Sequence, residues 1–208
     1  MSKLEKNTMV CNAKDYEIKD GVLEKYTGVD ANIIIPDEAT SIECCTFCEC
    51  SQLESIIIPD SVTAIGSGAF EKCKNLKSVI IGNGVTIIDD DAFNYCSQLE
   101  SVVIPDSVID VSDEAFYRCE NLKSVTIGKS VTRIGAGAFD SCVCLESIII
   151  PDSVTDIGQE AFQRCNALKE LTIGKGVTTI DAGAFYGCSQ LESVVIPDSV
   201  IDIGDVAF

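Results

Sequence analysis

Residues 53–73 read Leu-Glu-Ser-Ile-Ile-Ile-Pro-Asp-Ser-Val-Thr-Ala-Ile-Gly-Ser-Gly-Ala-Phe-Glu-Lys-Cys, and close copies of this stretch recur every 23 residues along the chain. The eight phenylalanines keep the same spacing, at Phe47, Phe70, Phe93, Phe116, Phe139, Phe162, Phe185 and Phe208. A period this strict indicates one small unit that is copied and stacked, so the sequence predicts a repeat solenoid. Each repeat of a solenoid contacts only its neighbours, and the array therefore counts as one structural unit.

Three segments can be distinguished within each unit. The pattern Leu-x-Ser-Val/Ile-x-Ile has β-branched residues at alternate places and predicts a short strand. A second extended piece is expected at residues 62–65, and Ala-Phe-x-x-Cys, as at residues 69–73, predicts a helical turn on the return path. Stacking should align the units as parallel strands about 4.8 Å apart, with the phenylalanines in one continuous column.

Two features alternate from one unit to the next, which indicates a 46-residue double unit. The turn after the strand alternates between proline and glycine: Pro59, Gly82, Pro105, Gly128, Pro151, Gly174, Pro197. A charged position alternates with it: Glu54, Lys77, Glu100, Lys123, Glu146, Lys169, Glu192. In a parallel stack each glutamate would lie beside a lysine above and below, so we interpret this column as a device that sets the register.

The segment before the array has the pattern of a hairpin. Residues 16–18 and 22–26 flank Asp20-Gly21, a dipeptide typical of two-residue β-turns. Such a hairpin would cover the edge of the first rung. We therefore divide the chain into a leader and hairpin cap at residues 1–31 and a repeat array at residues 32–208.

The other end of the array shows no cap. The chain stops at Phe208, partway through a unit, which leaves Val200 and Ile203 on an unstacked face. Terminal repeats normally carry a polar outer surface. We expect either a fragment of a longer protein or an end that associates with a partner.

The composition excludes several classes of function. The net charge is −18, and such a field repels phosphate backbones and anionic lipids, so nucleic acid is not an expected partner. No apolar run approaches the ~20 residues of a membrane helix, so membrane insertion is not expected. No signal peptide is visible, which favours the cytoplasm for the chain as written; a truncated N-terminus would leave the cell surface or secretion open.

Histidine is absent from the chain. Without histidine the chain cannot form Ser-His-Asp or Cys-His catalytic sites, HExxH metal sites or imidazole proton relays. We therefore expect no enzyme, no catalytic residues and no cofactor. The triplet at residues 89–91 and the repeated Pro-Asp-Ser lack the spacing of calcium-binding loops, and we interpret them as solvated acidic turns.

Most of the twelve cysteines have an evident structural explanation. One column of the repeat holds seven of them, which we expect to be small buried residues beside the phenylalanines: Cys50, Cys73, Cys96, Cys119, Cys142, Cys165, Cys188. Residues 44–50 contain a single CxxC, and without a second pair zinc is not expected. Cys48 and Cys144 lie off or beside this column, and we interpret them as candidates for exposed thiols with a redox role.

The repeated units resemble the BspA-like bacterial class of leucine-rich repeats, and the resemblance covers residues 31–208. It implies an α/β leucine-rich-repeat solenoid, right-handed and curved, with mostly short parallel strands and helical turns. Its concave face would be lined by strands. Proteins of this class are often displayed on cell surfaces and implicated in adhesion to host or matrix proteins. The resemblance implies no fixed ligand and no catalytic residues.

Strand alternation predicts an outward-facing column between the inward positions of the first strand. We predict that the partner-binding residues are Ile57, Ile80, Val103, Thr126, Ile149, Thr172 and Val195. An exposed aliphatic stripe edged by serines usually marks an interaction surface. The sequence thus favours a non-catalytic protein-interaction or adhesion module that binds a protein on its concave strand face. The alternative is a structural spacer or a scaffold that self-associates through the uncapped C-terminal end.

Overall fold

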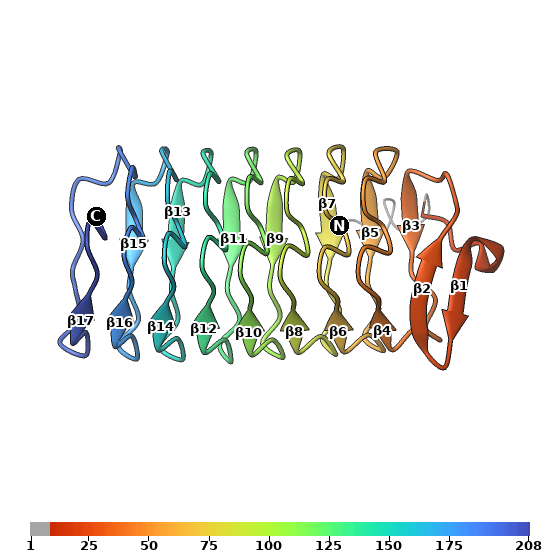
Figure 1. The fold of residues 1–208 in the computed structure, drawn as a ribbon, viewed down its shortest axis with the longest axis horizontal. Coiled ribbons are helices and arrows are strands. Elements are labelled where there is room, and N and C mark those ends of the chain that lie inside the picture. Colours follow the sequence, from red (N-terminus) through yellow and green to blue (C-terminus); the bar gives the residue numbers. More distant parts are fainter. Residues whose placement is uncertain (1–8) are drawn as a thin grey trace.

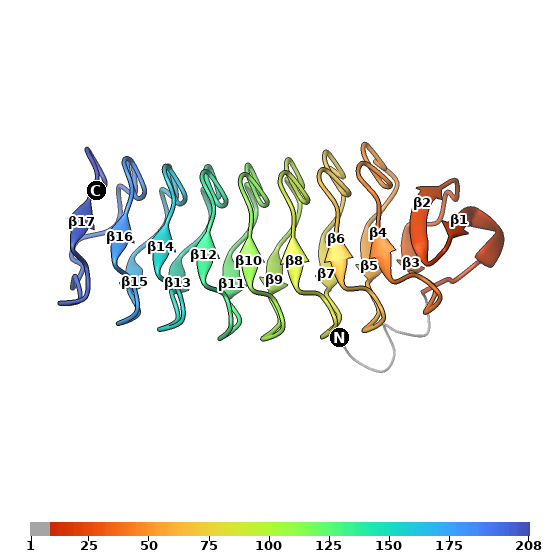
Figure 2. The same ribbon diagram turned by 60° about the horizontal axis from the view of Figure 1, so that its bottom comes forward.

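The computed structural model describes residues 9–208, which form one elongated, right-handed stack of rungs (Figure 1). Every rung except the last gives one strand to each of two sheets, and Figure 2 shows the strands following one another along the long axis. The 23-residue solenoid predicted from the sequence is confirmed.

The seven-stranded sheet is built from the Leu-x-Ser-Val/Ile-x-Ile segments. Its strands are β3 (Asn32–Ile34), β5 (Ser55–Ile57), β7 (Ser78–Ile80), β9 (Ser101–Val103), β11 (Ser124–Thr126), β13 (Ser147–Ile149) and β15 (Glu170–Thr172). All neighbours are parallel, and equivalent residues face one another, as Ile56 does Val79. This pairing places like side chains next to like side chains along the axis.

The ten-stranded sheet begins with a hairpin and continues with two-residue strands. Its members are β1 (Tyr16–Lys19), β2 (Val22–Tyr26), β4 (Ser41–Ile42), β6 (Ala64–Ile65), β8 (Ile87–Ile88), β10 (Asp110–Val111), β12 (Arg133–Ile134), β14 (Asp156–Ile157), β16 (Thr179–Ile180) and β17 (Asp202–Ile203). A 3-10 turn, η2 (Ala13–Asp15), precedes β1. The turn between β1 and β2 has positive φ at Asp20 and Gly21, as a two-residue type I′ turn requires.

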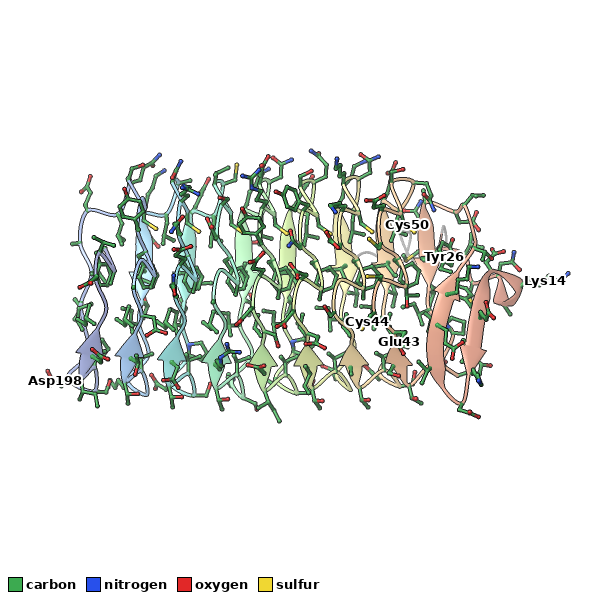
Figure 3. All side chains as sticks on the ribbon, in the orientation of Figure 1. Lys14, Tyr26, Glu43, Cys44, Cys50 and Asp198 are labelled. Carbon is green, nitrogen blue, oxygen red and sulfur yellow. The ribbon has the colours of Figure 1, made fainter. Side chains whose placement is uncertain are left out.

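An aromatic column runs through the middle of the molecule. The eight phenylalanine rings are stacked with centroids 4.9–5.3 Å apart and interplanar angles of 1–11°. The hairpin extends the column by two rings, because Tyr26 lies 5.1 Å from Phe47 and Tyr16 lies 5.2 Å from Tyr26. Figure 3 shows Tyr26 at the hairpin end of the array. The expected phenylalanine column is therefore present, and two tyrosines complete it.

The return path contains no helical turns, so that part of the sequence prediction is wrong. In each rung the residues two before and two after the phenylalanine have positive φ, as Gly68 (60°) and Lys72 (58°) do around Phe70. A left-handed residue breaks a helix after a single turn. Backbone N–H groups therefore alternate between acceptors in their own rung and acceptors in the next rung. Cys73 N donates to Phe70 O in its own rung (3.2 Å), whereas Phe70 N donates to Ala92 O in the next rung (2.8 Å).

The glycines of this column are sterically required, although the first two turns, at Pro36 and Pro59, are both prolines. A Cβ at Gly128 would lie 2.1 Å from the carbonyl oxygen of Pro105, and the equivalent distance is 2.4 Å at Gly82 and at Gly174. From Pro59 onward, each proline turn thus fits closely against a glycine turn. Its aspartate also accepts a backbone hydrogen bond from the next rung, as when Asp106 Oδ1 accepts from Lys129 N at 2.8 Å.

We predict that Gly128→Ala destabilises the protein by about 3 kcal/mol, because the new methyl group meets backbone that cannot rotate away. Chemical denaturation followed by circular dichroism measures this loss. The matched control is Lys129→Ala, one residue along, which keeps its backbone hydrogen bond and should change stability by less than about 0.5 kcal/mol. Similar small losses in both variants would contradict the steric explanation.

The alternating charges form one ion pair rather than a ladder. Lys77 Nζ lies 3.0 Å from Glu54 Oε2, and no other pair of this column comes within 4 Å in residues 9–208. Both side chains are about half exposed, and exposed pairs contribute little against the entropy of long side chains. Backbone hydrogen bonds hold the register instead, such as the bond from Lys77 N to Glu54 O (2.8 Å).

Candidate partner-binding face

The outer face of the seven-stranded sheet carries the side chains predicted to bind a partner. Each strand points its middle residue into the core and its outer two away from it. In β9, Val102 is buried, whereas Val103 is 62% exposed and Ser101 is also exposed. The alternation follows from the pleat, since successive side chains of a strand lie on opposite faces.

The predicted residues differ in exposure along the array. Val103, Thr126, Ile149 and Thr172 are exposed, and Ile149 reaches 69%. Ile57 and Ile80 are half-buried. The parallel register places these six residues in adjacent strands, with Ile57 opposite Ile80, Val103 opposite Thr126 and Ile149 opposite Thr172.

Ile34 also belongs to this surface, although it was not predicted. It is half-buried and pairs with Ile57 across β3 and β5. The signal was present in the sequence, because Ile33-Ile34-Ile35-Pro36 repeats the pattern of residues 56–59. We define the outer stripe as Ile34, Ile57, Ile80, Val103, Thr126, Ile149 and Thr172.

Val195 lies outside the sheet, contrary to the expectation that it would extend the column. The sheet ends at β15, and residues 193–195 form no strand. Val195 is 83% exposed. A cavity of about 650 Å³ separates the two segments, lined by Leu171 and Thr172 on one side and by Val194 and Val195 on the other. The stripe is therefore continuous only as far as β15.

The opposite edge of the sheet is covered by residues before the hairpin. Val10 forms an isolated parallel bridge with Ile33. Val10 N donates to Asn32 O at 2.9 Å, and Ile34 N donates to Val10 O at 3.0 Å. These bonds satisfy part of the exposed edge of β3, which would otherwise offer unpaired backbone groups.

The cysteine column is part of the core. Six of its members are buried and donate their thiol to the carbonyl oxygen of the phenylalanine one rung earlier, as Cys73 Sγ does to Phe47 O at 3.0 Å; the others are Cys96, Cys119, Cys142, Cys165 and Cys188. Burial raises the pKa of each of these thiols. A buried neutral thiol is a poor nucleophile, so the column has a structural role.

The two cysteines whose thiols were predicted to be exposed are half-buried. Cys48 and Cys144 are both of intermediate exposure, whereas Cys11, Cys44 and Cys45 are exposed. Burial, followed by the nearby Glu71 carboxylate, raises the pKa of Cys48 to about 11, which keeps it protonated near neutral pH. Figure 3 shows Cys44 and Cys50 at different heights of the same rung.

Acidic residues on the return path cap backbone amides of the stack. Asp90 Oδ1 accepts from Asp113 N at 3.1 Å, and Asp89 Oδ1 accepts from Asp90 N at 2.9 Å. Within residues 9–208 no three His, Cys, Asp or Glu side chains are grouped in a way that could hold a metal ion. No helix in the described part of the chain has the length and hydrophobicity to span a bilayer.

Comparison with known families identifies the repeat. The sequence matches the BspA-type leucine-rich repeat region, with six copies, over residues 17–143 and 86–208. The chain belongs to the BspA-type leucine-rich repeat family. BspA-type leucine-rich repeats are generally associated with protein interaction or with surfaces, and the fold is typically non-enzymatic. A comparison with curated proteins gave no match.

Solved structures share the BspA-type fold. A leucine-rich repeat protein from T. pallidum is 26% identical, with a TM-score of 0.81 over 88% of this chain and 91% of that one. One from Bacteroides ovatus is 28% identical, with a TM-score of 0.77 over 89% of this chain, which spans half of that protein. The pneumococcal vaccine antigen PcpA is 22% identical, with a TM-score of 0.51 over 84% of this chain and 58% of that one, a likeness of fold alone.

Proposed function

We propose that the protein is a non-catalytic protein-binding or adhesion module whose partner contacts the outer stripe. The observation that carries this proposal is the exposure of large β-branched side chains on a regular sheet, with Val103 at 62% and Ile149 at 69%. Aliphatic residues gathered on one face favour contact with a protein surface. Curvature that makes this face concave is part of the proposal, since it would let one partner contact several rungs.

The stripe is rigid and regularly spaced. Every strand between β5 and β13 is paired on both sides, so little backbone freedom would be lost on binding. The serine column borders the stripe on one side, and the charged column, which includes Glu54 and Lys77, lies next to the serines. An apolar centre with a polar rim is the usual composition of a protein interface.

The proposal is tested by replacing Ile80, Val103 and Ile149 with serine. Binding to a panel of immobilised matrix proteins, measured by surface plasmon resonance, should weaken at least tenfold, or about 1.4 kcal/mol. Ile87 and Ile109 offer a matched control, because they are 43% and 51% exposed at the ten-stranded sheet. Serine at these two positions should leave binding unchanged, and an equal loss in both variants would place the site elsewhere.

A second function is favoured by the C-terminal end. Phe208 is 46% exposed, and Ile201 and Val206 are 85% and 67% exposed. A scaffold or spacer that self-associates through this end would bury these side chains. Light scattering at increasing protein concentration tests the scaffold: a growing mass that Phe208→Ser abolishes supports it, and a constant monomer mass contradicts self-association.

A further inference from the structure

Two cysteines lie three residues apart on the return path of the rung that contains Phe47. Cys45 is exposed and Cys48 is half-buried. The return path of this rung runs between Cys44 and Cys50, which are labelled in Figure 3. No later rung has a cysteine at either of the two positions, so the repeat itself does not require them.

The backbone between these cysteines forms a tight turn. Cys48 N donates to Cys45 O at 3.0 Å, and Cys45 has a φ of 58°. The next rung repeats this turn, because Glu71 N donates to Gly68 O at 2.9 Å and Gly68 has a φ of 60°. A turn closed in this way keeps its first and fourth Cα atoms less than about 7 Å apart, and bridged cysteines need about 4.4–6.8 Å.

The Cβ atoms at these two positions also have the separation that a disulfide requires. A Cβ on Gly68 would lie 3.7 Å from the Cβ of Glu71, in the same turn one rung further on. The equivalent distance between Gly183 and Tyr186, further along the array, is 3.9 Å. Bridged cysteines have Cβ atoms about 3.5–4.5 Å apart. Since the turn of the cysteine pair has the same left-handed φ and the same hydrogen bond, its two Cβ atoms should lie about as close.

A third rung shows that side chains at these positions reach each other. Asp91 and Asn94 occupy them, and Asn94 Nδ2 donates a hydrogen bond to Asp91 Oδ1. Asp91 has the same left-handed backbone as Cys45, with a φ of 58°. In the cysteine pair, rotation about the two Cα–Cβ bonds should therefore bring the sulfur atoms together without movement of the backbone.

The surroundings of the two thiols differ, which sets the order in which they react. Cys45 is exposed, whereas Cys48 Sγ lies 3.9 Å from Glu71 Oε2. Burial and that carboxylate raise the pKa of Cys48 to about 11, so it is the slower thiol to attack a reagent from solution. Glu71 keeps a partner when Cys48 gives up its proton, because Lys72 Nζ lies 2.8 Å from Glu71 Oε1.

We propose that Cys45 and Cys48 form a modification site that reacts with low-molecular-weight disulfides, such as oxidised glutathione, to give a disulfide within one rung. This site lies on the return path, whereas the outer stripe belongs to the seven-stranded sheet. It therefore does not depend on the function proposed for the stripe, and either can fail without the other.

The reaction consists of two thiol–disulfide exchanges. The Cys45 thiolate attacks one sulfur of oxidised glutathione, and the first glutathione leaves as a thiolate that takes up the proton released by Cys45. Cys48 then loses its proton and attacks the Cys45 sulfur, and the second glutathione leaves and is protonated. This second step is intramolecular, which offsets the small fraction of thiolate at Cys48. Two protein thiols are oxidised to one disulfide, and one oxidised glutathione is reduced to two thiols.

The test is the reaction of the reduced full chain with oxidised glutathione at pH 8, followed by acid quenching and alkylation of the remaining thiols. Mass spectrometry of the intact protein should show two fewer alkyl groups, and peptide fragmentation should place the missing groups at Cys45 and Cys48. The equilibrium constant for this disulfide should be at least tenfold larger in the folded protein than in concentrated urea, because the turn is already closed.

Three serine variants separate the roles of the thiols. Cys44→Ser is the matched control, since it removes an adjacent exposed cysteine, and it should leave the disulfide unchanged. Cys48→Ser should leave a stable mixed disulfide with glutathione at Cys45, because the second exchange is removed. In Cys45→Ser, Cys48 should react with glutathione at least tenfold more slowly than Cys45 does in Cys48→Ser.

Circular dichroism should be the same for the reduced and the oxidised protein, because the backbone does not need to move. The proposal is overturned if the disulfide joins another pair, such as Cys44 and Cys48, or if glutathione stays bound at Cys45 in the unchanged protein. It is also overturned if oxidation alters the circular dichroism, or if the folded protein forms the disulfide no better than the unfolded chain does.

Discussion

Raising the pH above about 9 is expected to destabilise the array steeply. The cause is the buried cysteine column. Burial, and next the thiol of a neighbouring rung, raises the folded-state pKa of all four fully buried cysteines well above the ordinary value: Cys96, Cys119, Cys142 and Cys165. The pKa of Cys188 is raised to about 11.

The direction in which stability changes with pH follows from the number of protons bound in the folded and unfolded states. In the unfolded chain these thiols lose their protons near pH 8.5, whereas the folded state keeps them. Their stabilising contribution is complete below that pH and is lost as the pH rises toward the folded-state pKa. Each thiol that keeps its proton in the folded state lowers the free energy of unfolding by at most about 1.4 kcal/mol per pH unit above the pKa of the unfolded chain, and the buried thiols of the column all act in this direction.

Urea denaturation from pH 7 to pH 10.5 with a phosphine reductant measures this slope. Replacing Cys119 and Cys142 with alanine should make it shallower by about 2.7 kcal/mol per pH unit, because two titrating groups are removed. The carbonyl of Phe93 keeps a partner in this variant, since it also accepts from Cys96 N at 3.1 Å. A free energy of unfolding that is constant from pH 8 to pH 10, or a slope the variant does not change, would contradict this account.

Removing one ring from the middle of the aromatic column is the second change with a large expected effect. Phe116 is fully buried and lies 5.2 Å from both Phe93 and Phe139, with nearly parallel rings. Phe116→Ala should cost about 3–5 kcal/mol, because the cavity can be filled only by moving two hydrogen-bonded rungs. Since repeats contact only their neighbours, the two halves should also unfold less cooperatively.

Phe208→Ala is the control for this prediction, because the same substitution is made at the end of the same column. Phe208 is 46% exposed and stacks on Phe185 alone. Its loss should cost less than about 1.5 kcal/mol, and the unfolding transition should stay as steep as in the unchanged protein. Equal losses of stability at the two positions would show that contact with a ring on each side does not make Phe116 more stabilising than Phe208.

Part of the candidate sites was predictable and part was not. The outward direction of Val103 and Ile149 followed from strand alternation, because a period of two holds wherever a strand forms. The position of Val195 outside the sheet was not predictable. Residues 193–195 keep the sequence pattern of the earlier strands, yet they form no strand.

The 23-residue spacing by itself determined that this protein is a solenoid, that its phenylalanines form a column and that its first strand faces outward at alternate residues. Identical units stacked in register place equivalent side chains in contact, so the period is sufficient for these conclusions. The tertiary structure alone decided the path of the return segment. There, left-handed φ occurs at residues such as Glu114 and Arg118, which carry no glycine signal, because only inter-rung hydrogen bonds make that conformation favourable. It also decided that Tyr16 and Tyr26 extend the column, since the hairpin lies outside the repeat period.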